Sequence, residues 1–162
     1  MAETIGIIVS WIICLGFLTY ASIKDIRTRR IPLWVFPAMG VTGFVIRLAT
    51  GSASSPVFFY SSLLGMVIMG FIMIIVAAIG GAGGADVLMM GAIGLVTGIR
   101  HSLEIIIISY IPFVVYSVYI FCKEKKQDVP KDQRTKELPF VPFVTFGFVA
   151  DIVYNVIVET LR

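Results

Sequence analysis

Three aspartates lie within or beside long apolar stretches, where a carboxylate is costly and often functional: Asp25, Asp86 and Asp151. Asp25 closes the first apolar run, and Asp86 ends the glycine-rich segment GGAGGAD at residues 80–86. Two carboxylates that face one site rarely ionise together, so one keeps a proton while the other stays charged. Such a pair can activate water and protonate a leaving amine, as in aspartic proteases. Asp25 and Asp86 are therefore candidate catalytic residues.

The glycines before Asp86 suggest how a substrate could reach that carboxylate. Non-helical backbone at membrane depth is tolerated only where it is buried in protein or lines a wet cavity. Gly80, Gly81, Gly83 and Gly84 give the chain the freedom for such a loop. We expect Gly83 and Gly84, which have no side chains, to leave room for an extended substrate beside Asp86.

Simpler structural roles are open for both of these aspartates. Asp86 could cap the N-terminus of a helix, where its charge suits the helix dipole. Asp25 ends a helix, where an acid opposes the dipole, and it could pair with Lys24 or with Arg29 one turn further on.

Asp151 is expected to have a structural role. It falls well inside the last apolar run, and it could bond Tyr154 or Asn155 or line a polar seam between helices. The sole histidine, His101, is expected to be an interfacial residue beside Arg100, far from the other candidates.

Composition identifies the class of protein. The chain is 58% hydrophobic and only 14% charged, with a mean hydropathy of +0.97, whereas a soluble domain is roughly a quarter charged. Apolar runs long enough to cross a bilayer recur along it. We therefore expect an all-α polytopic membrane protein in which residues 1–162 form one membrane-embedded domain. The first apolar run is longer than that of a signal peptide and is expected to be a permanent span.

Six transmembrane helices are predicted, with a glycine-rich cytoplasmic loop before the fourth. The fourth contains small residues at Gly91, Gly94 and Gly98, which allow close helix approach. The predicted spans are residues 4–23, 33–50, 57–79, 86–99, 103–122 and 140–159.

Basic residues predict the orientation. Ten of the thirteen lysines and arginines fall in the connections after the first and fifth spans, which places those connections in the cytoplasm and both termini outside. The protein is thus predicted to be a multi-pass protein of the plasma membrane whose candidate site faces the cytoplasm. The net charge of +3 reflects this topology and contact with lipid headgroups rather than nucleic acid. The ten residues are Lys24, Arg27, Arg29, Arg30, Lys123, Lys125, Lys126, Lys131, Arg134 and Lys136.

Three stretches at matching depth resemble the type IV prepilin peptidase and preflagellin (prearchaellin) peptidase family, a group of membrane aspartyl proteases with a Gly-x-Gly-Asp motif. SIKDIRTRRIP is similar to the first motif, GGADVLMMGAIGLVTG to the second, and KELPFVPFVTFGF to a Pro-Phe-x-Pro-Phe stretch at the last span. The strict motif has glycine before the aspartate, whereas this chain has Ala85, a form that resembles archaeal members.

The resemblance implies an aspartic-type endopeptidase that removes short basic leader peptides from pilin-like or archaellin-like precursors. Asp25 and Asp86 would share one proton at the cytoplasmic membrane face. Neither a metal nor an organic cofactor is implied. The alternative is a small proton- or cation-coupled transporter, in which Asp86 and Asp151 line the path and the glycines interrupt a helix. A non-catalytic membrane scaffold would give the glycine-aspartate segment no purpose.

Overall fold

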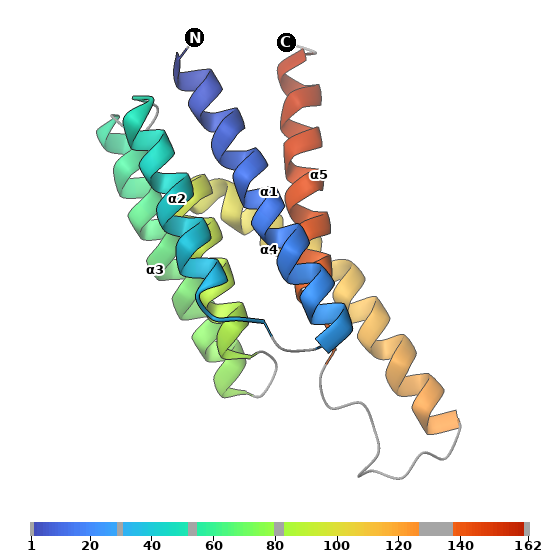
Figure 1. Ribbon diagram of the computed structural model, residues 1–162. Helices are drawn as coiled ribbons and strands as arrows, with labels where there is room; N and C mark the ends of the chain where they lie inside the picture. Colours follow the sequence, from blue (N-terminus) through green and yellow to red (C-terminus); the bar gives the residue numbers. More distant parts are fainter. Residues whose placement is uncertain (1, 29–30, 52–54, 80–82, 127–137, 161–162) are drawn as a thin grey trace.

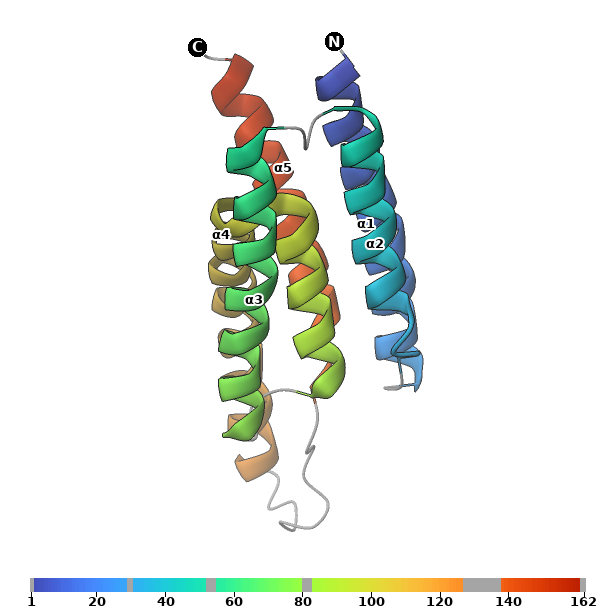
Figure 2. The same cartoon turned by 90° about the vertical axis from the view of Figure 1, so that its left-hand side faces the viewer.

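The computed structural model describes residues 2–28, 31–51, 55–79, 83–126 and 138–160. All regular structure in these ranges is helical, and the helices are α1 (Ala2–Thr28), α2 (Val35–Ala49), α3 (Pro56–Ala78), α4 (Gly84–Lys126) and α5 (Val141–Thr160). Helix α1 lies beside α2, and α3 lies beside the beginning of α4 (Figures 1 and 2). The end of α1 and the beginning of α4 lie at the same end of the bundle, opposite the chain termini (Figure 1).

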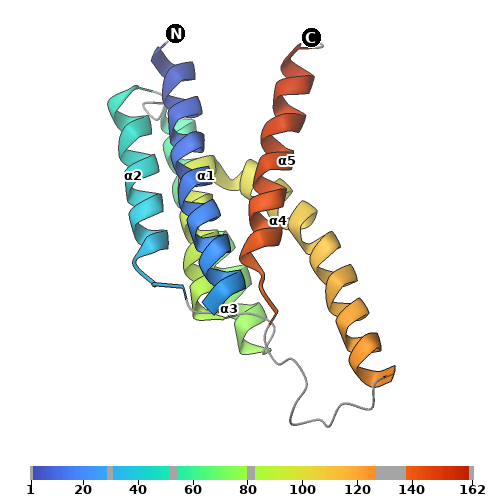
Figure 3. The same ribbon diagram turned by 45° about the vertical axis from the view of Figure 1, so that its right-hand side comes forward.

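Four of the five described helices are long and apolar enough to cross a membrane, and α2 is a shorter apolar helix. The count of six spans is not confirmed. Spans four and five correspond to the two arms of α4, which are joined by a kink at Gly98 rather than by the loop that was expected between residues 99 and 103. Helix α4 instead changes direction at Gly98, where φ is 81° and ψ is 173°. Figure 3 shows the divergence of its first arm (residues 84–97) from its second arm (residues 99–126).

Side chains from two other helices satisfy backbone groups at this kink. In a regular helix the Val96 carbonyl and the Ile99 N–H would bond partners four residues away. Here the buried Arg47 of α2 donates from Nη1 to the Val96 carbonyl at 2.5 Å. The Ile99 N–H donates to Ser61 Oγ of α3 at 3.2 Å. A Cβ on Gly98 would lie 2.8 Å from that hydroxyl oxygen, so both the positive φ and the space favour glycine.

Helix α3 and the first arm of α4 approach through a pair of glycines. A Cβ built on Gly65 would lie 2.6 Å from the Gly94 carbonyl oxygen, so a side chain there would force the backbones apart. This contact fits the predicted role of small residues in close membrane-helix packing.

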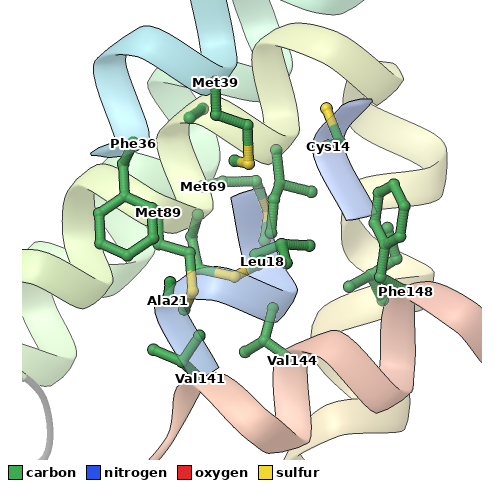
Figure 4. Close-up of a cluster of buried hydrophobic side chains, with 14 of the residues drawn as sticks. Cys14, Leu18, Ala21, Phe36, Met39, Met69, Met89, Val141, Val144 and Phe148 are labelled. Atoms are coloured by element: carbon green, nitrogen blue, oxygen red, sulfur yellow. The ribbon is translucent and has the colours of Figure 1, made fainter. Parts of the chain in front are cut away.

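The buried core gathers side chains from all five described helices. Figure 4 shows the region where α1, α2 and the first arm of α4 meet α3 and α5. The labelled residues are Cys14, Leu18, Ala21, Phe36, Met39, Met69, Met89, Val141, Val144 and Phe148. Many other large apolar side chains are exposed along the helices, as suits a protein whose outer surface faces lipid.

Candidate active site

Asp86 lies in the first turn of α4 and closes that turn on itself. Its Oδ2 accepts a hydrogen bond from the Gly83 N–H at 2.9 Å, while its own N–H donates to the Gly83 carbonyl at 3.1 Å. An acid at the third helical position that reaches back in this way satisfies a donor that the helix leaves unpaired. The capping role that the sequence allowed is thus present. It also fixes the position of the carboxylate.

Asp25 lies near the end of α1 and contacts the beginning of α5. Its Oδ2 accepts a hydrogen bond from the Val141 N–H at 3.3 Å. The carboxylate therefore meets the positive end of a helix dipole, although that helix is not its own. Of the two cationic partners considered from the sequence, Arg29 lies outside the described residues. Sequence reasoning missed Val141, because its contribution is a backbone group.

Asp25, near the end of α1, and Asp86, in the first turn of α4, lie at the same end of the bundle. They are near enough for the negative charge of Asp25 to contribute to the electrostatics of Asp86, and the charge of Asp86 also reaches Tyr110. Both aspartates are half-buried. Each accepts a hydrogen bond from an N–H at the beginning of a helix.

An aromatic cluster supports the Val141 end of this site. The Phe140 ring, one residue before Val141, lies 5.3 Å from the Tyr110 ring and 5.0 Å from the Phe113 ring, both edge-on. Edge-to-face pairs at such distances are favourable. The second arm of α4 therefore braces the segment whose N–H holds Asp25.

There is open space beside Asp86 on the glycine side. Gly83 and Gly84 are exposed, and a Cβ built on Gly84 would meet nothing within 4 Å. A Cβ on Gly83 would lie 3.7 Å from Asp86 Oδ2. Gly80 and Gly81, the other half of the predicted loop, lie outside the described residues.

The segment that contains both aspartates also matches a known protein family. A sequence model of the type IV leader peptidase family matches residues 12–118. The chain belongs to that family. No curated protein and no solved structure matches the chain significantly.

Membership in the leader peptidase family, together with the apolar helices, identifies a multi-pass membrane protein of a peptidase family. The family match ends before KELPFVPFVTFGF, so the third resemblance rests on the sequence alone. It is this stretch, however, that contains Val141 and Phe140.

Asp151 lies apart from Asp25 and Asp86. It follows Val141 by ten residues in α5, or about 15 Å at 1.5 Å per residue. It is 2% exposed, and its Oδ2 lies 3.2 Å from His101 Nδ1. Asn155 Nδ2 donates to its Oδ1 at 3.2 Å, one of the partners expected from the sequence. The contact between His101 and Asp151 was not expected from the sequence, and the interfacial position of His101 stays a prediction.

Proposed function

We propose that this leader peptidase family member is an aspartic-type endopeptidase that removes a short basic leader from pilin-like or archaellin-like precursors. The observation that supports this most directly is that Asp25, near the end of α1, and Asp86, in the first turn of α4, lie at the same end of the bundle, where the charge of one acts on the other. Catalysis at the cytoplasmic membrane face is inferred from the basic residues around Asp25 in the sequence and from the position of the beginning of α4 at the same end of the bundle as the end of α1.

In the proposed reaction the two carboxyls share one proton and act as a unit. The ionised carboxylate accepts a proton from a water molecule as the water oxygen attacks the peptide carbonyl carbon. The protonated carboxyl hydrogen-bonds the carbonyl oxygen and supplies the proton that the leaving amine requires. The C–N bond then breaks to give a free acid and a free amine. The hydrogen bonds from Gly83 and Val141 keep the two groups in position during these steps.

The proposed substrate has a cationic head followed by an apolar helix held in the bilayer. The extended segment between them would lie against Gly83 and Gly84, where the space beside the backbone is open. The connections near the site are themselves rich in lysine and arginine. Charge attraction between these connections and a basic leader therefore cannot be the main source of binding, and we assign that to the apolar helix.

The transporter alternative gains no support from these contacts. It requires Asp86 and Asp151 along one path, whereas Asp86 interacts with Asp25 and Asp151 pairs with His101. Family membership favours the peptidase as well.

The proposal is tested by co-expression with a precursor that has a basic leader and an apolar helix. Cleavage is read as a gel shift of the precursor. Wild type is expected to cleave, and Asp25→Asn and Asp86→Asn are each expected to fail at matched membrane expression, because an amide cannot exchange the proton. Asp132→Asn, in the polar connection outside the described residues, is the matched control and should cleave normally. Normal cleavage by either of the first two variants would rule out the aspartate pair.

A further inference from the structure

A second group of ionisable side chains lies between the second arm of α4 and α5. His101 and Glu104 are one turn apart on α4, and Asp151 reaches them from α5. His101 Nδ1 lies 3.2 Å from Asp151 Oδ2 and 3.8 Å from Glu104 Oε2. One nitrogen and two carboxylate oxygens, one from each residue, all lie within 4.8 Å of one another.

One carboxylate oxygen of this group, Glu104 Oε2, accepts no hydrogen bond from the described residues. Glu104 Oε2 is buried and has no hydrogen-bond partner among the described residues, while Oε1 accepts from Arg100 Nε at 3.2 Å. A buried carboxylate oxygen without a partner carries the full cost of its desolvation. A cation bound between Glu104, His101 and Asp151 would remove that cost.

The donor set and the spacing suit a divalent transition-metal ion. Zn²⁺ takes histidine nitrogen and carboxylate oxygen at about 2.0–2.2 Å in tetrahedral geometry, which places ligand atoms roughly 3.4 Å apart. The three atoms lie within 4.8 Å of one another, so the side chains would have to close in on the ion only slightly. Histidine and glutamate three residues apart on a helix, completed by a carboxylate from another helix, also form metal sites in soluble bundles.

We propose that His101, Glu104 and Asp151 bind one divalent transition-metal ion, with Zn²⁺ as the representative, and that the ion joins the second arm of α4 to α5. With neutral His101, the ion and the two carboxylates form a group of zero net charge. The site begins three residues after the Gly98 kink, so the ion fixes the direction of the arm just after it turns. Its place beyond Val141 on α5 makes this role structural and independent of peptide cleavage.

The chain offers a sharp spectroscopic test, because His101 is its only histidine. The full chain carries a tag without histidine and the change Cys122→Ser, which removes an exposed thiol. It is purified in detergent and stripped with a chelator. Cu²⁺ is the spectroscopic probe, since it binds nitrogen and oxygen sites most tightly of the divalent first-row ions. We expect electron paramagnetic resonance to show coupling to one imidazole nitrogen, which His101→Gln removes.

Zn²⁺ binding is then counted per chain by elemental analysis after gel filtration, and thermal unfolding is followed with and without Zn²⁺. We expect one ion per chain and a higher unfolding temperature with Zn²⁺. Glu104→Gln and Asp151→Asn should weaken binding by roughly 100-fold or more, beyond the loss caused by changing an outer partner. Asp25→Asn is the control and should bind Zn²⁺ as wild type does.

Two results would overturn the proposal, and both are independent of how well the variants fold. The first is wild-type protein that retains no Zn²⁺ and shows no imidazole coupling. In that case His101 contacts the two carboxylates without a metal. The second is equal Zn²⁺ retention by wild type and by a folded Glu104→Gln variant, which would place the ion elsewhere.

Discussion

Two groups of acidic side chains lie at different depths of this helix bundle and are held by different partners. The described hydrogen bonds to Asp25 and Asp86 come from backbone N–H groups at the beginnings of α5 and α4, and both carboxylates are half-buried. Asp151 is buried and is held by the side chains of His101 and Asn155.

This difference separates a site suited to chemistry from one suited to stability. Asp25 and Asp86 each accept a hydrogen bond from a backbone N–H at a helix N-terminus, and two carboxyls at one site relieve their repulsion by sharing a proton. Asp151 instead contacts a histidine side chain of another helix. The first arrangement favours proton transfer to a substrate, and the second ties two helices together.

The largest expected effect is that of substituting Asp86, which should abolish cleavage without reducing the stability of the protein. Asp86→Asn keeps an oxygen that can accept from the Gly83 N–H but cannot exchange a proton. The cleavage rate should fall roughly 10²–10⁴-fold, the usual contribution of an acid–base group. Thermal unfolding in detergent should be nearly unchanged. If Asp86→Asn instead lowered the unfolding temperature strongly and the remaining folded protein cleaved at the wild-type rate, Asp86 would serve only as a helix cap.

The converse is expected at Asp151. In chelator-stripped protein, Asp151→Asn leaves His101 facing a neutral amide and should lower the free energy of unfolding by about 1–3 kcal/mol, the usual effect of weakening a buried hydrogen bond to a charged group. Denaturation in detergent measures this. Asn155→Ala, which removes only the 3.2 Å bond to Asp151 Oδ1 and the 2.8 Å bond to its carbonyl, should cost less. Equal stability of Asp151→Asn and wild type would contradict the proposed division of roles.

A smaller effect is expected at the open space beside the first pair. Gly84→Val should reduce cleavage roughly tenfold or more by occupying the position of the extended substrate, an effect on binding and orientation rather than on proton transfer. The protein should still fold, since a Cβ at residue 84 meets nothing within 4 Å. Gly84→Ala is the matched control and should retain most of the activity. The test is a comparison of cleavage rates at equal expression. A normal rate for Gly84→Val would show that the substrate does not lie at this position.

Sequence reasoning identified the first group better than the second for physical reasons. The lengths of the apolar runs and the distribution of basic residues placed Asp25 and Asp86 at one end of the bundle. The contact between His101 and Asp151 depends instead on the direction that α4 takes after Gly98. A glycine in an apolar run can equally serve close helix packing, as Gly94 does, so the sequence does not reveal that Gly98 has a positive φ.

The partner of Asp25 was equally hidden in the sequence. A backbone N–H is available at nearly every residue, so nothing in the letters around Val141 marks its contact with α1. The Pro-Phe stretch indicated only that the beginning of the last helix resembles a family motif. The structure adds the contribution of this stretch to packing, which is the contact of the Phe140 ring with α4.

The smallest expected effect tests whether that packing matters to the aspartate pair. Phe140→Leu keeps an apolar side chain but removes the edge-on contacts with Tyr110 and Phe113. Each of the two contacts contributes about 0.5–1.5 kcal/mol beyond burial, so the free energy of unfolding should fall by about 1–3 kcal/mol. Cleavage should fall several-fold, because the Val141 N–H is then less firmly placed against Asp25.

Phe146→Leu is the matched control, because Phe146 lies on α5, six residues after Phe140, and is 59% exposed. Its stability and cleavage rate should stay near those of wild type. If Phe140→Leu lost stability but cleaved at the wild-type rate per folded molecule, the Val141 contact would be a tether between α1 and α5 rather than part of the chemistry. Asp25 would then need its orientation from α1 itself, and the contrast between the two acidic groups would rest on Asp86 alone.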